Sequence, residues 1–380
     1  LSRPAGTGAG LSRERTPWVQ RPVATASGRT NSAALVYGCS ASNSVRCGSI
    51  ACATSTRDGG GPSISAAIEV TPASLMPQGT MLSKPPRPLV TLRANPCIVV
   101  CFDTRMPMAA ILRSGRLSVA ASQTPEQAYA TYRHMASMVK DAGFNFNLGP
   151  VVDLRCDPHD ETHQPASAVI GVLGRSFADE PAVAERYATA FIRAHHDEGL
   201  LTALKHYPGH GLAHDDSHLG LVDVTGTAQS MELRPFRHLI RAGLADAVLT
   251  AHLVNRRIDP DWPITLSQKM IGPHLRERLH FGGVVVTDDM HMGAIQKYHG
   301  EREALVRAIQ AGNDLLVYSN STVAAREVPG FAPRYDMGQH VAALVQDAIA
   351  RGELTPQQIE ASWQRLARLR ARLHPALPLA

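Results

Sequence analysis

The sequence has few of the features that mark nucleic-acid-binding and membrane-spanning proteins. Its net charge of +5 is spread over 380 residues without a run of five Lys or Arg, and only 5% of its residues are aromatic. We therefore expect no nucleic-acid partner. No stretch approaches 18 consecutive apolar residues, and the opening LSRPAGTGAGLSRERT has no apolar signal-peptide core. We expect a cytoplasmic protein without a membrane partner.

Metal-binding patterns are also missing. An even number of cysteines predicts a disulfide framework mainly in short secreted chains, so we predict none here. His-Glu-x-x-His is absent, and five of the six cysteines lie early in the chain at spacings typical of no zinc site: Cys39, Cys47, Cys52, Cys97 and Cys101. We expect neither a metal nor a cofactor.

The chain divides into two unequal parts. Residues 1–90 are rich in Ser, Ala, Gly, Thr, Pro and Arg and show no sustained helical or strand period. We predict a low-complexity or atypical N-terminal segment there, with little packed structure. Residues 91–375 form the second part. The 380-residue chain, 44% hydrophobic, is long enough for one large core but also allows two ordinary domains, so length alone does not choose.

Helices and strands alternate regularly from about residue 124. Thr124 is a predicted N-cap, Pro125 occupies the first helical position, and Gly143 ends that helix. Other predicted helices end at Gly199, Gly243, Gly312 and Gly352. Short apolar runs between helices predict buried parallel strands over residues 148–154, 201–206, 247–252, 283–288 and 313–318. This alternation predicts an α/β fold.

Polar side chains close the C-terminal ends of several predicted strands. These are Asp153, Lys205 with His206, His252 and Asp288. In a (β/α)8 barrel the C-terminal strand ends converge on one face, whereas a doubly wound sheet gathers such groups only near a switch point. We therefore predict a (β/α)8 TIM-type barrel, with the doubly wound sheet as the alternative.

The densest polar cluster is KHYPGHGLAHDDSH, residues 205–218, which directly follows a predicted strand. It is open to three interpretations: a solvated surface loop, a metal site built from His and Asp ligands, or an acid/base centre at Asp216 and His218. In the third, the imidazole titrates near neutrality, so it can give and recover a proton while the carboxylate orients the ring.

A second cluster, VVVTDDMHMG over residues 284–293, places two carboxylates at the end of a valine-rich strand. Consecutive strand residues face opposite sides, so Asp288 and Asp289 should have different roles. We expect one to face the site and the other to accept backbone amides. A helix N-cap role fits Asp289 better than Asp288.

These two clusters carry a family resemblance. KHYPGHG followed by DSH at Asp216 resembles the Lys-His-(Phe/Tyr)-Pro-Gly-His-Gly-x4-Asp-Ser-His signature of the single-domain, NagZ-type β-N-acetylhexosaminidases of glycoside hydrolase family 3, and VVVTDDM resembles their nucleophile strand. FNFNLGPVVDL, LGRSF, VLTAH and AGNDLLVYSN occur in the family's order. The resemblance covers about residues 126–372.

The resemblance implies a retaining glycosidase mechanism. Asp288 would be the nucleophile that forms a glycosyl-enzyme. His218, supported by Asp216, would protonate the leaving oxygen and then activate water. Arg175, Lys205 and His206 would bind sugar hydroxyls, and His252 is a further candidate for substrate binding.

The early part of the chain departs from the family pattern. The family's early strand ends in Asp-Gln-Glu-Gly-Gly-Arg-Val, whereas CIVVCFDTRMP keeps only one matching acid, Asp103, which we take as a substrate-binding candidate. No first barrel strand is recognisable in residues 1–90. We therefore expect the first βα units to be atypical or incomplete.

The activity that the resemblance implies is hydrolysis of terminal, non-reducing β-linked N-acetylglucosamine, in cell-wall muropeptide recycling by a monomer. The partner would be a small carbohydrate, either an N-acetylglucosaminyl-anhydromuropeptide or a chitooligosaccharide. One alternative is phosphorolysis, because a histidine acid/base does not repel phosphate as a glutamate does. The other is an inactive homologue that only binds sugar.

Overall fold

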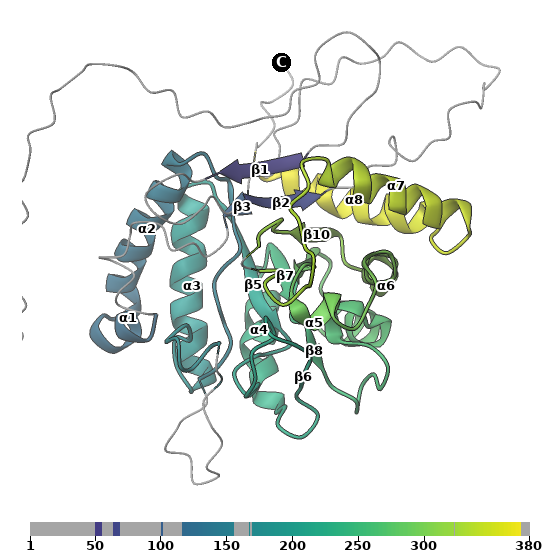
Figure 1. Ribbon diagram of the computed structural model, residues 1–380. Helices are drawn as coiled ribbons and strands as arrows, with labels where there is room; N and C mark the ends of the chain where they lie inside the picture. The colour runs from purple at the N-terminus through teal and green to yellow at the C-terminus, as the bar shows by residue number, and fades with distance from the viewer. Residues whose placement is uncertain are drawn as a thin grey trace, which may run out of the picture. The chain divides into compact units, whose positions relative to one another are not determined.

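The computed structural model describes residues 116–155, 167, 169–322 and 324–373, together with the backbone of three earlier strands. Its main sheet has the strand order β1-β2-β10-β9-β7-β5-β4-β3 (Figure 1). The parallel strands are β3 (Val100–Cys101), β4 (Phe146–Asn147), β5 (Leu201–Tyr207), β7 (Ala247–Thr250), β9 (Val284–Asp289) and β10 (Leu315–Tyr318). Each lies beside the next in chain order without a reversal, which is the arrangement of a TIM-type barrel and not of a doubly wound sheet.

The barrel is incomplete among the described residues, as we expected. β2 (Ile64–Ile68) runs antiparallel beside β10, and β1 (Ile50–Thr54) runs antiparallel to β2. Both strands fall within residues 1–90, where composition had suggested little packed structure. The physical reason for the difference is that the edge of β10 offers unpaired backbone groups, which a short segment can satisfy without any period of its own.

The described helices follow the predicted start and stop signals. Thr124 and Gln127 form a capping box at α2, and Gly143, Gly199, Gly243, Gly312 and Gly352 all have positive φ just beyond helix ends, as expected. None of the helices among these residues is long and apolar enough to cross a membrane. Their bounds are α1 (Arg116–Ser122), α2 (Pro125–Asp141), α3 (Pro181–Asp197), α4 (Leu233–Arg241), α5 (Gly293–Gln296), α6 (Glu301–Ala311), α7 (Met337–Ala350) and α8 (Pro356–Ala371).

One predicted strand was wrong. Residues 148–154 do not form a continuous strand: β4 comprises only Phe146–Asn147, and further along only Val151 forms a bridge, to Lys205. Pro150 interrupts the run because it has no N–H to donate to the sheet. The other four predicted strands are β5, β7, β9 and β10, with ends displaced by no more than two residues. A small second sheet pairs β6 (Val222–Asp223) with β8 (Leu253–Val254).

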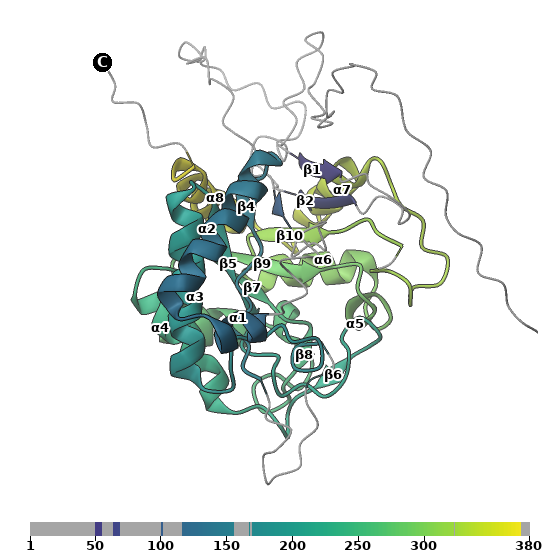
Figure 2. The same ribbon diagram turned by 90° about the vertical axis from the view of Figure 1, so that its left-hand side faces the viewer.

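Both faces of the parallel strands are buried. One face packs against α3 and α4, and α2 lies on the other side of α3 (Figure 2); this face includes Leu204, Val248 and Val285. The opposite face, here called the inner face, packs against Leu366 and Leu369 of α8. Its strand residues recur at every second position, as the pleat requires: Leu201, Ala203, Ala247, Leu249, Val284, Val286, Leu315 and Val317.

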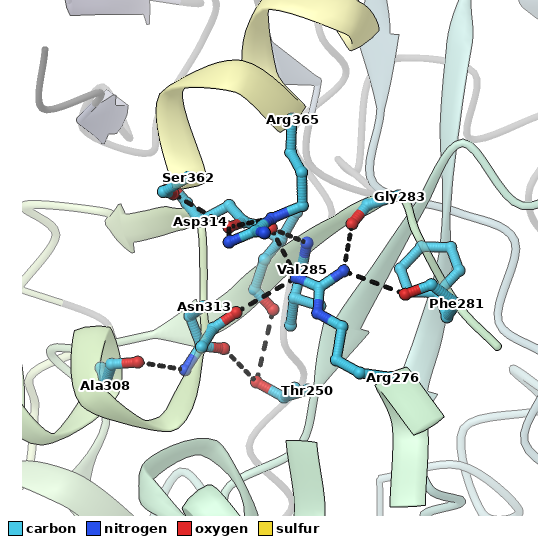
Figure 3. A network of polar contacts seen from close by, with 12 residues as sticks. Thr250, Arg276, Phe281, Gly283, Val285, Ala308, Asn313, Asp314, Ser362 and Arg365 are labelled. Carbon is cyan, nitrogen blue, oxygen red and sulfur yellow. Dashed lines mark hydrogen bonds and ion pairs between the residues drawn. The ribbon is translucent and has the colours of Figure 1, made fainter. Parts of the chain in front are cut away.

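A buried carboxylate fixes α8 in place. Asp314, directly before β10, accepts hydrogen bonds at Oδ2 from Arg276 Nη2 and from the N–H of Val285, both at 2.8 Å (Figure 3). At Oδ1 it accepts from Arg365 Nε at 2.8 Å and from Ser362 Oγ at 2.9 Å, both on α8. Because both oxygens of this buried charge are paired, the network stabilises the N-terminal strand ends, opposite Asp288.

Candidate active site

Three of the predicted site residues, Lys205, His206 and Asp288, lie at the C-terminal ends of β5 and β9. Val284 and Val286 belong to the inner face, and the alternation along β9 directs Asp288 to the same side. Asp288 is the one residue of β9 that is not buried. Leu201 and Ala203 place Lys205 on the inner face of β5 by the same rule, and Lys205 is buried. Two residues 83 positions apart, counted as 288 minus 205, therefore share one face of the barrel.

Asp288 and Asp289 have different environments, as predicted. Asp288 Oδ1 accepts the N–H of Asp289 at 2.8 Å. Asp289 Oδ1 instead accepts the N–H groups of His291 at 3.1 Å and Ser319 at 3.0 Å. Burial raises the pKa of Asp288, but the neighbouring histidine rings and the Asp289 N–H outweigh it and bring that pKa to about 2. Asp288 is therefore an ionised carboxylate available to a ligand, whereas Asp289 fixes the turn after β9.

His206 is oriented by the buried carboxylate of Asp153. Its Nδ1 lies 2.6 Å from Asp153 Oδ2, and its backbone N–H donates to the same carboxylate. The carboxylate only accepts, so Nδ1 carries the proton and Nε2 faces Arg175 Nη2 at 3.5 Å. Burial, followed by the charge of Arg175, lowers the pKa of His206 well below its usual value. The His206 ring and the Arg175 guanidinium thus lie together, and their contact with a sugar stays a prediction.

A second buried carboxylate, Glu232, holds the turn that follows β5. Its Oε1 accepts the N–H groups of Gly211 at 3.0 Å and Leu212 at 3.2 Å. Two glycines allow close packing here: a Cβ on Gly209 would lie 2.5 Å from Glu232 Cβ, and one on Gly211 would lie 1.8 Å from the carbonyl oxygen of Leu154 on another segment. The glycines of the KHYPGHG motif are therefore required by close backbone packing.

Asp216 and His218 form the contact expected of an acid/base pair. His218 Nδ1 lies 2.6 Å from Asp216 Oδ1, which also accepts the backbone N–H of His218 at 2.8 Å. Burial raises the pKa of Asp216, but these hydrogen bonds and the charges of His218 and Arg326 outweigh it and lower that pKa. The His218 side chain is 40% exposed, so its ring can meet a ligand from solvent.

The loop that carries His218 rests on the segment that follows Asp288 in the chain. The N–H of Ala294, in α5, donates to the carbonyl of Ser217 at 3.2 Å. Lys297 Nζ donates to the carbonyl of Leu219 at 2.7 Å. A Cβ on Gly293 would lie 2.8 Å from the carbonyl oxygen of His218. The acid/base loop and the nucleophile strand are therefore joined through α5.

His252 lies at the end of β7 with both ring nitrogens bonded. Nδ1 is 2.9 Å from Thr265 Oγ1, and Nε2 is 2.9 Å from the carbonyl oxygen of Asp289. The ring is buried and braces the end of β9. Contact between His252 and a sugar remains a prediction, and so do the sugar contacts of Lys205 and Arg175. Asp103 lies outside the described residues.

Sequence reasoning missed two carboxylates and a cation of this site. Asp153 was noted as a polar strand end without a role, and neither Glu232 nor Arg326 was identified. Only Asp153 had a local signal, its position after an apolar run. No group of three or more His, Cys, Asp or Glu side chains in the described residues is arranged to hold a metal ion.

Replacing Glu232 with glutamine is expected to change how stability depends on pH. Burial, reinforced by the charge of Asp153, raises the pKa of Glu232 from 4.5 to about 7. Between these values the folded state keeps a proton that the unfolded state has lost, so this contribution to stability falls as the pH rises. Glutamine does not ionise. As the pH rises from about 5 to about 8, the free energy of unfolding of the variant should increase by about 1–3 kcal/mol relative to that of the parent, measured by thermal unfolding. A difference independent of pH would contradict this.

Comparison with known proteins identifies the family. Residues 104–369 match the glycosyl hydrolase family 3 N-terminal domain. The chain belongs to this family. The beta-hexosaminidase of Xanthomonas axonopodis pv. citri is 30% identical over 272 residues, which cover 68% of this chain and 76% of that protein. Beta-hexosaminidase A of Pseudoalteromonas piscicida is 29% identical over 278 residues.

Solved structures show the same fold. A glycoside hydrolase family 3 beta-N-acetylglucosaminidase from Paenibacillus sp. matches with a TM-score of 0.59 and 31% identity, over 70% of this chain. A family 3 glycosyl hydrolase from Mycobacterium smegmatis matches with a TM-score of 0.58 and 29% identity, over 72% of this chain and 82% of its own. The match spans only 48% of the Paenibacillus chain and 44% of the Pseudoalteromonas protein.

Proposed function

We propose that this protein is a retaining β-N-acetylhexosaminidase that hydrolyses terminal, non-reducing β-linked N-acetylglucosamine. Asp288 is the nucleophile and the Asp216/His218 pair is the acid/base. The family, and the hexosaminidase activity named for the relatives, support this substrate class. A muropeptide or chitooligosaccharide substrate, a role in peptidoglycan recycling, a cytoplasmic location and a monomeric state belong to the same proposal.

The observation that carries the proposal is that the chain holds both an ionised carboxylate, Asp288, and a separate imidazole–carboxylate pair, His218 with Asp216. Asp288 is held at the end of β9 with a pKa of about 2. The His218 ring is held 2.6 Å from Asp216 on a loop that rests on α5. A retaining glycosidase needs these two functions: a charged nucleophile and a separate group that acts first as acid and then as base.

In the first step, a carboxylate oxygen of Asp288 forms a bond to the anomeric carbon while the bond to the leaving oxygen breaks. His218 donates its Nε2 proton to that oxygen, so the leaving group departs as a neutral alcohol. Asp216 orients the ring through Nδ1 and stabilises the imidazolium before the transfer. Arg175, Lys205 and His206 are proposed to hold sugar hydroxyls, which keeps the anomeric carbon in line with Asp288.

In the second step, the neutral His218 ring takes a proton from water at Nε2. The water oxygen attacks the anomeric carbon and the bond to Asp288 breaks. The sugar leaves with its original β configuration, and His218 is protonated again for the next cycle. Two inversions at one carbon therefore require only one histidine, acting first as acid and then as base.

Phosphorolysis is the second candidate, and the charge around the acid/base pair favours it. The only carboxylate in contact with the His218 ring, among the described residues, is Asp216, whose other oxygen faces Arg326 at 3.5 Å. An incoming phosphate therefore meets an imidazole and a guanidinium and not an uncompensated carboxylate. Phosphate would then attack the glycosyl-enzyme in place of water and yield a sugar 1-phosphate.

Release of nitrophenol from 4-nitrophenyl N-acetyl-β-glucosaminide by the purified chain tests the proposal. The hydrolase is expected to yield free N-acetylglucosamine at a rate independent of added phosphate. Formation of N-acetylglucosamine 1-phosphate would instead establish the phosphorylase. A folded chain that binds N-acetylglucosamine but releases no nitrophenol would support the non-catalytic sugar-binding homologue.

A further inference from the structure

Arg326 is a cation on the acid/base pair that comes from a distant part of the chain. It lies in the turn region after β10, and its Nη2 is 3.5 Å from Asp216 Oδ2. The other oxygen of Asp216 is occupied by the ring and the backbone of His218. Each carboxylate oxygen of Asp216 therefore has its own partner.

Glu327, the neighbour of Arg326, also contacts the acid/base loop, through Lys297. Glu327 Oε2 accepts from Lys297 Nζ at 2.9 Å, and that ammonium also donates to the carbonyl of Leu219 at 2.7 Å. Residues 326 and 327 thus contact the acid/base loop twice, once directly and once through Lys297. The segment after β10 therefore holds the loop on which His218 lies.

We propose that Arg326 is a positioning residue of the acid/base pair, which fixes the Asp216 carboxylate and so holds the His218 ring in place for proton transfer. This inference rests on the proposed acid/base role of His218. Arg326 acts on His218 through Asp216. Because the guanidinium holds one carboxylate oxygen, the other stays in place to orient the ring, and proton transfer to a poor leaving group depends on that orientation.

Several other charged groups face this pair. Asp288 and His252 interact electrostatically with His218 from the side of the barrel. Lys297 and Glu327 lie at the loop, but they neutralise each other as an ion pair. Arg326 is therefore a cation of this group that contacts Asp216 directly.

Substitution of Arg326 with glutamine separates positioning from a structural role. For N,N′-diacetylchitobiose, whose leaving alcohol needs a proton, kcat/KM is expected to fall about fivefold, the size of one exposed ion pair. For the 4-nitrophenyl glycoside, whose leaving group departs without help, it should fall less than about twofold. The loss for chitobiose should be smaller in about 1 M salt, which screens the Arg326–Asp216 ion pair in the parent. Arg326→Lys should recover most of the chitobiose activity.

Two further variants make the result decisive. Arg133→Gln breaks a comparable ion pair, 2.8 Å from Glu198, on α2, and should leave both substrates unaffected. His218→Ala measures the full loss of acid catalysis in the same assays. An equal loss for both substrates in Arg326→Gln, or no loss, while His218→Ala discriminates between them, would overturn the inference. If His218→Ala itself does not discriminate, the proposed acid/base role fails instead.

Discussion

Replacing Asp288 with asparagine is expected to lower kcat for 4-nitrophenyl N-acetyl-β-glucosaminide by roughly 10⁴-fold or more, because a neutral amide cannot form the glycosyl-enzyme. The variant keeps the shape of the side chain and an oxygen to accept the Asp289 N–H, so folding should be preserved. Steady-state nitrophenol release, with circular dichroism of both proteins, measures the effect.

Asp223→Asn is the matched control for this substitution. Asp223 is an exposed aspartate of β6, which belongs to the small second sheet, and it pairs with Arg256 at 3.0 Å. It should retain full activity. Residual activity in Asp288→Asn above about 1% of the parent would be too high for loss of the nucleophile. Another residue would then be the nucleophile.

Replacing His218 with alanine is expected to separate substrates by their leaving groups. Loss of general acid catalysis should lower kcat/KM for N,N′-diacetylchitobiose by about 10²–10⁴-fold. For the nitrophenyl glycoside, which leaves as a stable phenolate, the loss should be about tenfold or less. Azide is expected to restore kcat for the nitrophenyl substrate by attacking the glycosyl-enzyme without a base and giving a glycosyl azide.

His134→Ala provides the comparison for this second experiment. His134 is an exposed histidine of α2, so its removal changes composition in the same way without touching the site. Its kinetics should match the parent. If His218→Ala lost both activities equally and azide restored neither, the ring would be contributing to folding or binding and not to proton transfer.

The predictions that the structure confirms depend on local chemistry. Helix ends were predicted at Gly143 and Gly312 because both need a positive φ that glycine adopts without strain. The different environments of Asp288 and Asp289 followed from the alternation of a strand. The incomplete opening of the barrel was predicted because CIVVCFDTRMP departs from the family's early strand.

The features that were not predicted depend on contacts between distant segments. Nothing near Glu232 indicates that its carboxylate will reach Gly211, 21 residues earlier. Arg326 reads as an ordinary surface arginine until the chain brings it to Asp216. The pairing of β2 with β10 joins segments about 250 residues apart, and no local pattern specifies it.

The position of α8 has a consequence for synthesis of the chain on the ribosome. Leu366 and Leu369 complete the inner face, yet all the strands they cover are translated earlier. Until residue 369 leaves the exit tunnel, the inner-face residues of β9 and β10 lack the two α8 leucines that cover them. A nascent chain stalled before α8 should therefore be a good substrate for holdase chaperones, and release from them should coincide with the Asp314 contacts to Ser362 and Arg365.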